Sequence, residues 1–548
     1  MRIVRYGLLT AAAIFGLLVA ARAIWGPLRF PVAVRTPINI ESVCGLCLVL
    51  ALAIPFGHSP DSRWKQPTTL AGSAALLVLV VVAFRKALET YFLADDFLLV
   101  TFANAFQPTT IFHMLTTGGG DGFFRPAGYW SLGLTATWAR FDPRLWHATA
   151  LALHALNAVL VSALASRLGL SRRASWFAGA LFAIHGCLPE STVWIAGRFD
   201  LLATCFVLSG LLAFAAQWRV LSLAFLVLAL LSKEEAYIFP LLAVLLAVSL
   251  RIPWRKATPL LSLFLLVTCI LFVYRWKLQG GIGGYTDLKS GAPLFGELGS
   301  LQAIRSLALR LWAVLFFPIN WSRQPGVLLG SVTAAYVAAL VWLAANRTGR
   351  LALLFPLGTV FLAALPPLHQ LLIGPDLQKS RLLYLPLVGF SLLLATAVEP
   401  LEPRARWIVP AAILLFQFTA LQHNLDAWRR TGEIAKQSCI AAASCLRPGA
   451  TKVDVWNMPG SLDGVYFLDL GLKECIHMQT PSVAPEVEFH SGDPTAAQDQ
   501  LIWDETSLGL TCPVERPVKV ATTAVKPTFY DHHKPTDTKP ATKTASAK

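Results

Sequence analysis

The chain has 548 residues, of which 55% are hydrophobic and only 14% are charged, and its mean hydropathy is +0.58. Soluble domains carry about 25% charged residues, so this composition excludes a soluble globular protein and predicts a polytopic membrane protein. The formal net charge of +15 does not indicate nucleic-acid binding, because the Lys and Arg residues fall in short clusters between apolar segments, a pattern typical of cytoplasmic loops.

Runs of about 20 apolar residues are long enough to span a bilayer. The sequence contains about thirteen such runs, several of them short. They predict spans near residues 7–25, 40–57, 68–86, 146–166, 174–188, 199–217, 219–232, 236–250, 258–275, 326–345, 351–372, 382–399 and 407–424.

The basic clusters predict the orientation of these spans, because Lys and Arg are enriched in cytoplasmic loops. No Lys or Arg occurs between Lys86 and Arg125, so the first large loop, about residues 90–145, is expected outside, with the N-terminus in the cytoplasm. Its aromatic-rich part suits a helix at the membrane interface. The apolar segment Leu301–Trp321 contains two arginines and is predicted to be interfacial or re-entrant, which places the C-terminal part outside as well.

The hydrophobicity falls after about residue 425, where the stretch TKVDVWNMPGSLDGVYFLDLGL predicts two short strands around a Pro-Gly turn. Cys439, Cys445, Cys475 and Cys512 allow two disulfides if this part is extracytoplasmic. The expected organisation is N-terminal transmembrane helices over 1–66, a membrane region over 67–424, a small α/β or β-rich domain over 425–513 and a disordered tail over 514–548.

Charged and polar side chains gather at the expected outer ends of the spans. Asp95 and Asp96 are adjacent in the apolar stretch YFLADDFLLV, although a charge at the bilayer centre costs roughly 2.5–3.5 kcal/mol. Other candidates on the same side are Arg125, His185, Glu190, Arg198, Asp200, Lys233, Glu234, Arg381 and Tyr384. Such a set suits transfer from a lipid-linked phosphate donor, because cations can hold the phosphate and a carboxylate can take a proton from an attacking hydroxyl.

Simpler interpretations exist for the same residues. Ion pairs at helix ends can be purely structural, and the two aspartates could belong to a solvated loop. His147, His154 and Asn157 share one face of a predicted helix, which favours hydrogen bonds between packed helices over ligand binding.

Four sequence blocks, together with the acidic pair, resemble the GT-C glycosyltransferases, which use polyprenyl-phosphate sugars. The similarity is to the membrane region of the transmembrane and tetratricopeptide-repeat O-mannosyltransferases and their bacterial relatives, over about residues 70–400. Gly186 replaces the usual proline, and the tetratricopeptide repeats are absent, which leaves open a protein, glycolipid or polysaccharide acceptor. The blocks are HALNAVL (154–160), LFAIHGCLPESTVWIAGRFDLLA (181–203), LLSKEEAYIFP (230–240) and KSRLLYLP (379–386).

The resemblance implies an all-α membrane fold with about 13 transmembrane helices in a GT-C-like arrangement and an inverting hexosyltransferase, mannose being one candidate sugar. Asp95 is the implied catalytic base, and Asp96 binds the acceptor or orients the base. The implied donor-phosphate ligands are Arg198, Lys233 and Arg381, and the implied site-lining residues are Arg125, His185, Glu190, Asp200, Glu234 and Tyr384.

The expected partners are the bilayer of a bacterial inner membrane, a lipid-linked sugar donor and a periplasmic acceptor, without nucleic acid. No cofactor or metal is expected, since no residues have metal-ligand spacing. Three alternatives stay open. An O-antigen ligase or polymerase would have a dominant late loop, a lipid-glycan transporter or flippase would have repeated halves, and an inactive scaffold would only present the C-terminal domain.

Overall fold

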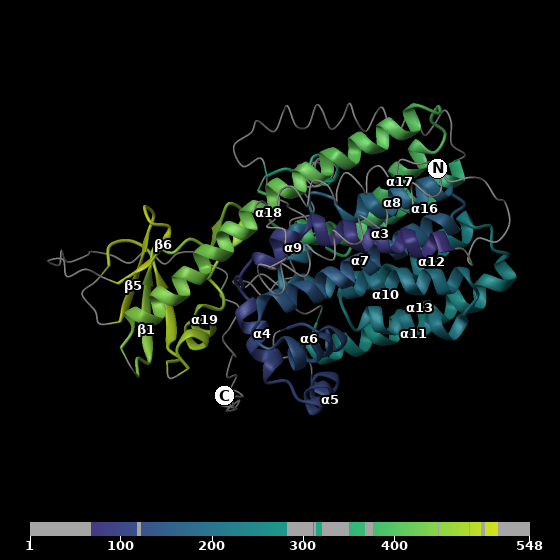
Figure 1. The fold of residues 1–548 in the computed structure, drawn as a ribbon. Coiled ribbons are helices and arrows are strands. Elements are labelled where there is room, and N and C mark those ends of the chain that lie inside the picture. Colours follow the sequence, from purple (N-terminus) through teal and green to yellow (C-terminus); the bar gives the residue numbers. More distant parts are fainter. Residues whose placement is uncertain are drawn as a thin grey trace, which may run out of the picture.

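The computed structural model shows a bundle of apolar helices joined by one long helix to a small domain that contains a β-sheet (Figure 1). The expected spans near 7–25, 40–57 and 326–345, most of Leu301–Trp321 and the tail over 514–548 lie outside the residues that it describes. These are 67–117, 122–281, 311, 314–320, 350–367, 376–447, 449–481, 483–494 and 499–512.

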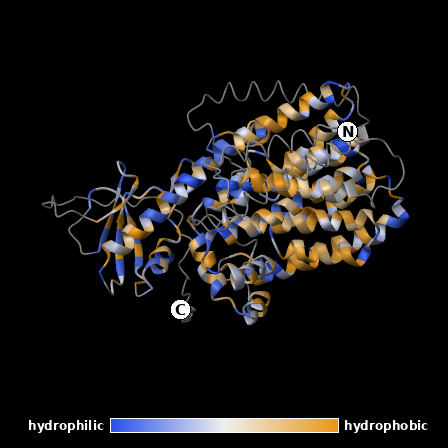
Figure 2. Ribbon diagram, viewed as in Figure 1, coloured by the Kyte–Doolittle hydropathy of each residue, from blue (hydrophilic) through white to orange (hydrophobic). Residues whose placement is uncertain are grey.

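The helices of the bundle follow the predicted apolar runs, and their hydrophobic residues are conspicuous in Figure 2. Within the described part of the chain, five helices are long and apolar enough to cross a membrane. They are Pro143–Arg167, Ile195–Ala215, Trp254–Gln279, Ser380–Val398 and Ala405–Cys445. The helices of the bundle are α3 (Pro67–Ala83), α7 (Pro143–Arg167), α8 (Arg172–Ala183), α10 (Arg198–Ala215), α11 (Arg219–Leu230), α12 (Phe239–Ser249), α13 (Trp254–Gln279), α16 (Arg350–Ala364) and α17 (Tyr384–Val398).

The described residues of the first large loop form three further helices, α4 (Asp96–Asn104), α5 (Pro108–Thr117) and α6 (Pro126–Ala139). Large apolar side chains of α6 are exposed, among them Trp130 at 57% and Trp138 at 51%. Exposed aromatic rings of this kind suit the membrane–water interface. The helix predicted here is confirmed, and its interfacial location stays a prediction.

Helix α18 (Ala405–Cys445) extends well beyond the predicted span near 407–424 and has 41 residues. The sequence after residue 424 contains no proline up to Cys445, so nothing interrupts the backbone hydrogen bonding where the hydrophobicity falls. The helix therefore carries the chain from the bundle directly into the C-terminal domain (Figure 1). At Gly432 it approaches the start of the first loop so closely that a Cβ atom would lie 2.8 Å from Thr90 Cγ2.

The C-terminal domain contains a sheet with strand order β4-β1-β5-β6. Strand β1 pairs in parallel with β4 and β5, and β5 pairs antiparallel with β6. Helices α18 and α19 contact strands of this sheet, and Val453 and Val455 of β1 are fully buried. The elements are β1 (Lys452–Trp456), β2 (Ser461–Leu462), β3 (Val465–Tyr466), α19 (Leu472–Gln479), β4 (Glu486–His490), β5 (Gln500–Asp504) and β6 (Gly509–Thr511).

The strands expected around the Pro-Gly turn do not pair with each other. Strand β1 joins the main sheet, whereas β2 pairs with β3 across Asp463 and Gly464. Both turn residues have positive φ values, 48° and 80°, which is the backbone required by a tight hairpin with an Asp-Gly turn. We call Ser461–Tyr466 the β2–β3 hairpin.

The four C-terminal cysteines form two disulfides, as the sequence allowed. Cys439 pairs with Cys475, and Cys445 pairs with Cys512. Both bonds connect the last turns of α18 to the domain that follows it. Disulfides persist in oxidising compartments, and the extracytoplasmic location of the domain stays a prediction.

Candidate active site

The two adjacent aspartates lie in different environments. The Asp96 side chain is 0% exposed, and it accepts hydrogen bonds from the backbone N–H groups of Leu93 at 3.1 Å and Ile195 at 2.8 Å. Asp95 as a whole residue is partly exposed, but its Oδ1 atom is buried and has no hydrogen-bond partner among the described residues. Asp96 therefore ties the start of α4 to the segment before α10, while Asp95 remains available to a substrate.

The turn that precedes the two aspartates is supported by the C-terminal domain. Ala94 has a φ of 45°, a left-handed conformation that costs a residue with a Cβ atom roughly 1–2 kcal/mol. Gly471, at the start of α19, packs against the Ala94 carbonyl so closely that any Cβ atom there would collide with it. The C-terminal domain thus contacts the strained turn that orients Asp95.

The Asp95 carboxyl group has a pKa raised to about 6, mainly because it is buried and further because of the Asp469 charge. The Arg381 guanidinium and the Trp194 indole N–H oppose this shift by lowering the pKa. A carboxylate with a pKa close to the working pH is a more effective general base than an ordinary aspartate.

Arg381 lies in a stack of planar groups beside this carboxylate. Its guanidinium carbon is 4.3 Å from the centroid of the Trp194 ring. The Trp194 ring stacks in turn on the ring of Tyr466 in the β2–β3 hairpin, with 4.9 Å between the ring centroids. The Arg381 side chain is 26% exposed, and its Nε atom is 3.9 Å from Glu190 Oε1, too far for a hydrogen bond. Part of its donor capacity can therefore reach a ligand.

Glu190 is the second carboxylate beside Arg381. Its Oε2 atom accepts hydrogen bonds from Ser380 Oγ at 3.2 Å and from the Arg381 backbone N–H at 3.4 Å. Its Oε1 atom is buried without a hydrogen-bond partner in the described part of the chain. Burial raises the pKa of Glu190 to about 7, and the Asp200 charge adds to this while Arg381 opposes it.

Other predicted site residues form a buried network of ion pairs. Glu234 accepts from Arg125 Nη2 at 2.7 Å and lies 3.3 Å from Arg275 Nη2, and the two arginines hold its pKa below the ordinary value despite its burial. Lys233 pairs with Asp200 and with Glu235. These carboxylates largely neutralise the Lys233 charge, whereas Arg381 has a single, longer ion pair with Glu190 among the described residues.

Protein groups enclose three predicted site residues, namely Arg198, His185 and Tyr384. Arg198 is 2% exposed and donates to Thr135 Oγ1 and to the Trp146 carbonyl. His185 bonds to the Leu315 carbonyl at 2.8 Å.

The Tyr384 hydroxyl group forms a hydrogen bond with His154 Nδ1 at 2.7 Å and accepts another from Asn157 Nδ2 at 3.1 Å. These contacts connect α7 to α17, as expected of packing hydrogen bonds on one face of α7. The structure therefore gathers Asp95, Glu190 and Arg381 into one site, with Arg198, His185 and Tyr384 bonded elsewhere.

Sequence reasoning missed three contributors to this site. Trp194 lies within a quoted block, but an aromatic residue in an apolar block predicts only packing. Tyr466 and Asp469 come from the C-terminal domain, and no local pattern indicates that this segment folds back onto the first loop.

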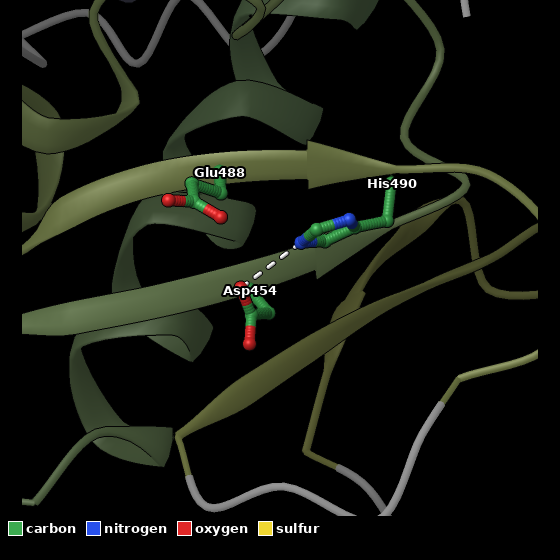
Figure 3. Close-up of side chains that lie close together, drawn as sticks. All are labelled: Asp454, Glu488 and His490. Atoms are coloured by element: carbon green, nitrogen blue, oxygen red, sulfur yellow. Dashed lines mark hydrogen bonds and ion pairs between the residues drawn. The ribbon is translucent and has the colours of Figure 1, made fainter. Parts of the chain in front are cut away.

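A separate group of potential metal ligands lies on the sheet of the C-terminal domain (Figure 3). The ligand atoms of Asp454, Glu488 and His490 are within 4.8 Å of one another, because β1 and β4 are paired in register. Lys452 Nζ lies 3.0 Å from Glu488 and 3.7 Å from Asp454. The Lys452 ammonium group therefore already forms ion pairs with both carboxylates. The sequence prediction of no metal remains a prediction.

No protein-family model and no curated protein matches the chain. The fold resembles the crystal structure of ArnT from Cupriavidus metallidurans in the apo state, with 14% identity and a TM-score of 0.44, over 76% of this chain and 89% of that chain. The crystal structure of the same protein bound to undecaprenyl phosphate gives 14% identity and a TM-score of 0.43, over 81% of this chain and 94% of that one. The likeness concerns the fold only.

Proposed function

We propose that the protein is an inverting GT-C-type glycosyltransferase that moves a hexose from a polyprenyl-phosphate donor to a hydroxyl group outside the cytoplasm. The observation that carries the proposal is that Asp95, a carboxylate with an unbonded oxygen, lies near enough to Arg381, a partly exposed cation, for the Arg381 charge to lower the Asp95 pKa. A base and a phosphate ligand are the two groups that this chemistry requires.

The reaction begins when the acceptor hydroxyl oxygen attacks the anomeric carbon of the donor sugar. Its proton passes to the Asp95 carboxylate while the bond between the anomeric carbon and the phosphate oxygen breaks. The polyprenyl phosphate leaves with one more negative charge, which Arg381 stabilises by charge-assisted hydrogen bonds. Attack from the face opposite the phosphate inverts the configuration.

The position of Arg381 suits a donor anchored in lipid. It is the second residue of the apolar helical segment Ser380–Val398, whose length and composition allow it to cross a membrane. A polyprenyl tail can then stay among the helices while its phosphate reaches the guanidinium. The charged groups of the site lie at helix ends rather than at mid-span, which favours a transferase over a flippase.

A test of the donor site compares Arg381→Gln with wild type in proteoliposomes. We expect affinity for polyprenyl phosphate to fall about 10- to 100-fold, since hydrogen bonds to charged groups contribute about 1.5–3 kcal/mol. Arg447→Gln is the control, because Arg447 is an arginine in an ion pair with Asp499, at a position outside the proposed site. Equal affinity in wild type and Arg381→Gln would contradict the assignment of Arg381.

A further inference from the structure

A pocket lies between the helical bundle and the β2–β3 hairpin, directly beside Glu190. The bundle contributes Glu190, Asp376 and Ser380, and the hairpin turn contributes Asp463 and Gly464. Because Glu190 also pairs with Arg381, the pocket adjoins the proposed site of sugar transfer. Its free space is that of about one water-sized group, so it can receive one hydroxyl-bearing edge of the molecule that accepts the sugar.

The polar groups of the pocket favour hydrogen-bond donors and disfavour anions. Three carboxyl groups, those of Glu190, Asp376 and Asp463, line it, and no Lys or Arg does so among the described residues. Arg381 and Arg430 lie behind this lining, beside Glu190 and Asp463. The Glu190 side chain is 3% exposed, and its Oε1 atom is an acceptor without a hydrogen-bond partner in the described residues. A buried acceptor left unbonded costs about 1–3 kcal/mol, which a hydroxyl donor from a ligand would recover.

The pocket also has an apolar surface supplied by helix α18. Trp428 lines it, and an indole ring offers a rigid apolar face beside the polar groups. Carbohydrates combine the two properties that this lining matches, hydroxyl donors around the ring edge and C–H groups on the ring face. An anionic group would instead face the Asp376 carboxylate, together with the carboxyl groups of Glu190 and Asp463, whose charges Arg381 and Arg430 offset only in part.

We propose that this pocket binds the acceptor and that the acceptor is an uncharged carbohydrate. The inference rests on the proposed function and specifies its second substrate. Hydroxyl groups of the carbohydrate donate to Glu190 and Asp376, and one hydroxyl is presented to Asp95. The β2–β3 hairpin forms the outer side of the pocket, so the C-terminal domain determines which acceptor is used.

The hairpin is fixed in place by several contacts to the rest of the chain. Asn320 Nδ2 donates to the Asp463 carbonyl at 2.9 Å, and Arg430 pairs with the Asp463 side chain at 3.0 Å. Gly464, with a φ of +80°, lies against the Asp376 carbonyl, where a Cβ atom would collide. Replacing this glycine would therefore displace the hairpin from the pocket.

The test compares Gly464→Ala with Gly449→Ala. Gly449 has nearly the same φ, +83°, but faces open space, so both alanines meet the same backbone strain and only one collides. Sugar transfer is measured in proteoliposomes with the uncharged glycan fraction of native envelope extract as the acceptor. We expect Gly464→Ala to raise the acceptor KM about tenfold and the donor KM by less, because Tyr466 of the same hairpin stacks on Trp194 beside Arg381, and we expect Gly449→Ala to leave both unchanged.

Asp376→Asn provides a second variant if Gly464→Ala does not fold. The asparagine oxygen can still accept the hydrogen bond that Asp376 receives from the Gln378 backbone, so only the charge is lost, and we expect a smaller rise in the acceptor KM alone. The inference is overturned if Gly464→Ala and Asp376→Asn both keep the wild-type acceptor KM. It is also overturned if the transferred sugar is recovered on anionic glycan or on protein. A wild-type protein that transfers no sugar to any fraction would overturn the proposed function itself.

Discussion

At the residue scale, the sequence predicted that the Asp95–Asp96 pair matters, and the family resemblance implied Asp95 as the base and Asp96 as a residue that binds the acceptor or orients the base. Neither predicted the backbone contacts that hold Asp96. Two neighbouring carboxylates indicate that one pKa is raised. Only the fold shows that Asp96 is held by backbone N–H groups near residues 93 and 195, while Asp95 has an unbonded oxygen. The partners of Asp96 are about one hundred residues apart, so local sequence carries no information about them.

Replacing Asp96 should therefore affect stability more than replacing Asp95. In Asp96→Ala the buried N–H groups of Leu93 and Ile195 lose their acceptors, at about 1–3 kcal/mol for each unsatisfied group. We expect a lower unfolding temperature in detergent for Asp96→Ala and a near-wild-type value for Asp95→Ala. Equal unfolding temperatures for the two variants would show that Asp96 is not an anchor.

The raised pKa of Asp95 predicts a pH dependence of the reaction. Its carboxyl group has a pKa of about 6, so the ionised form that accepts a proton is present above this pH and is lost as the pH falls through it. We expect kcat/KM to decrease about tenfold per pH unit below pH 6, as for a single essential base. A profile that stays flat from pH 7 to pH 5 would rule out Asp95 as the base.

At the element scale, apolar length predicted the helices well, because hydrophobic runs are a local property of the sequence. The continuation of α18 to Cys445 was missed, since hydropathy marks the end of a membrane span and not the end of a helix. The pairing of β1 with β4 and β5 was missed as well. It joins residues that lie more than thirty positions apart, and no turn motif encodes it.

Buried ion pairs connect several of these elements, and Glu234 is the central member of one group. It joins Arg125, which precedes α6, to Arg275 of α13. We expect Glu234→Gln to lower the free energy of unfolding by about 3–5 kcal/mol, because removing one partner leaves buried charge uncompensated.

The control for Glu234→Gln is Glu402→Gln, at an exposed position, where we expect a change within about 0.5 kcal/mol. The measurement is denaturant unfolding in detergent micelles. A Glu234→Gln variant as stable as Glu402→Gln would show that the network contributes nothing to the fold.

At the scale of the whole molecule, the C-terminal domain belongs to the site. Gly471 supports the turn at Ala94, and Tyr466 stacks on Trp194 beside Arg381. Sequence analysis separated this domain from the membrane region at a drop in hydrophobicity and left its role undefined. The division into 1–66, 67–424, 425–513 and 514–548 stays a prediction, as do the membrane orientation and the periplasmic location.

The most direct test of the central claim is sugar transfer by wild type, Asp95→Asn and Asp96→Asn in reconstituted membranes. Polyprenyl-phosphate sugars are offered one at a time with native envelope extract as the acceptor. We predict that wild type transfers one sugar and that Asp95→Asn, correctly folded and still able to bind donor, is slower by about 10²–10⁴-fold, the usual contribution of a general base. Transfer by Asp95→Asn at the wild-type rate would contradict the account.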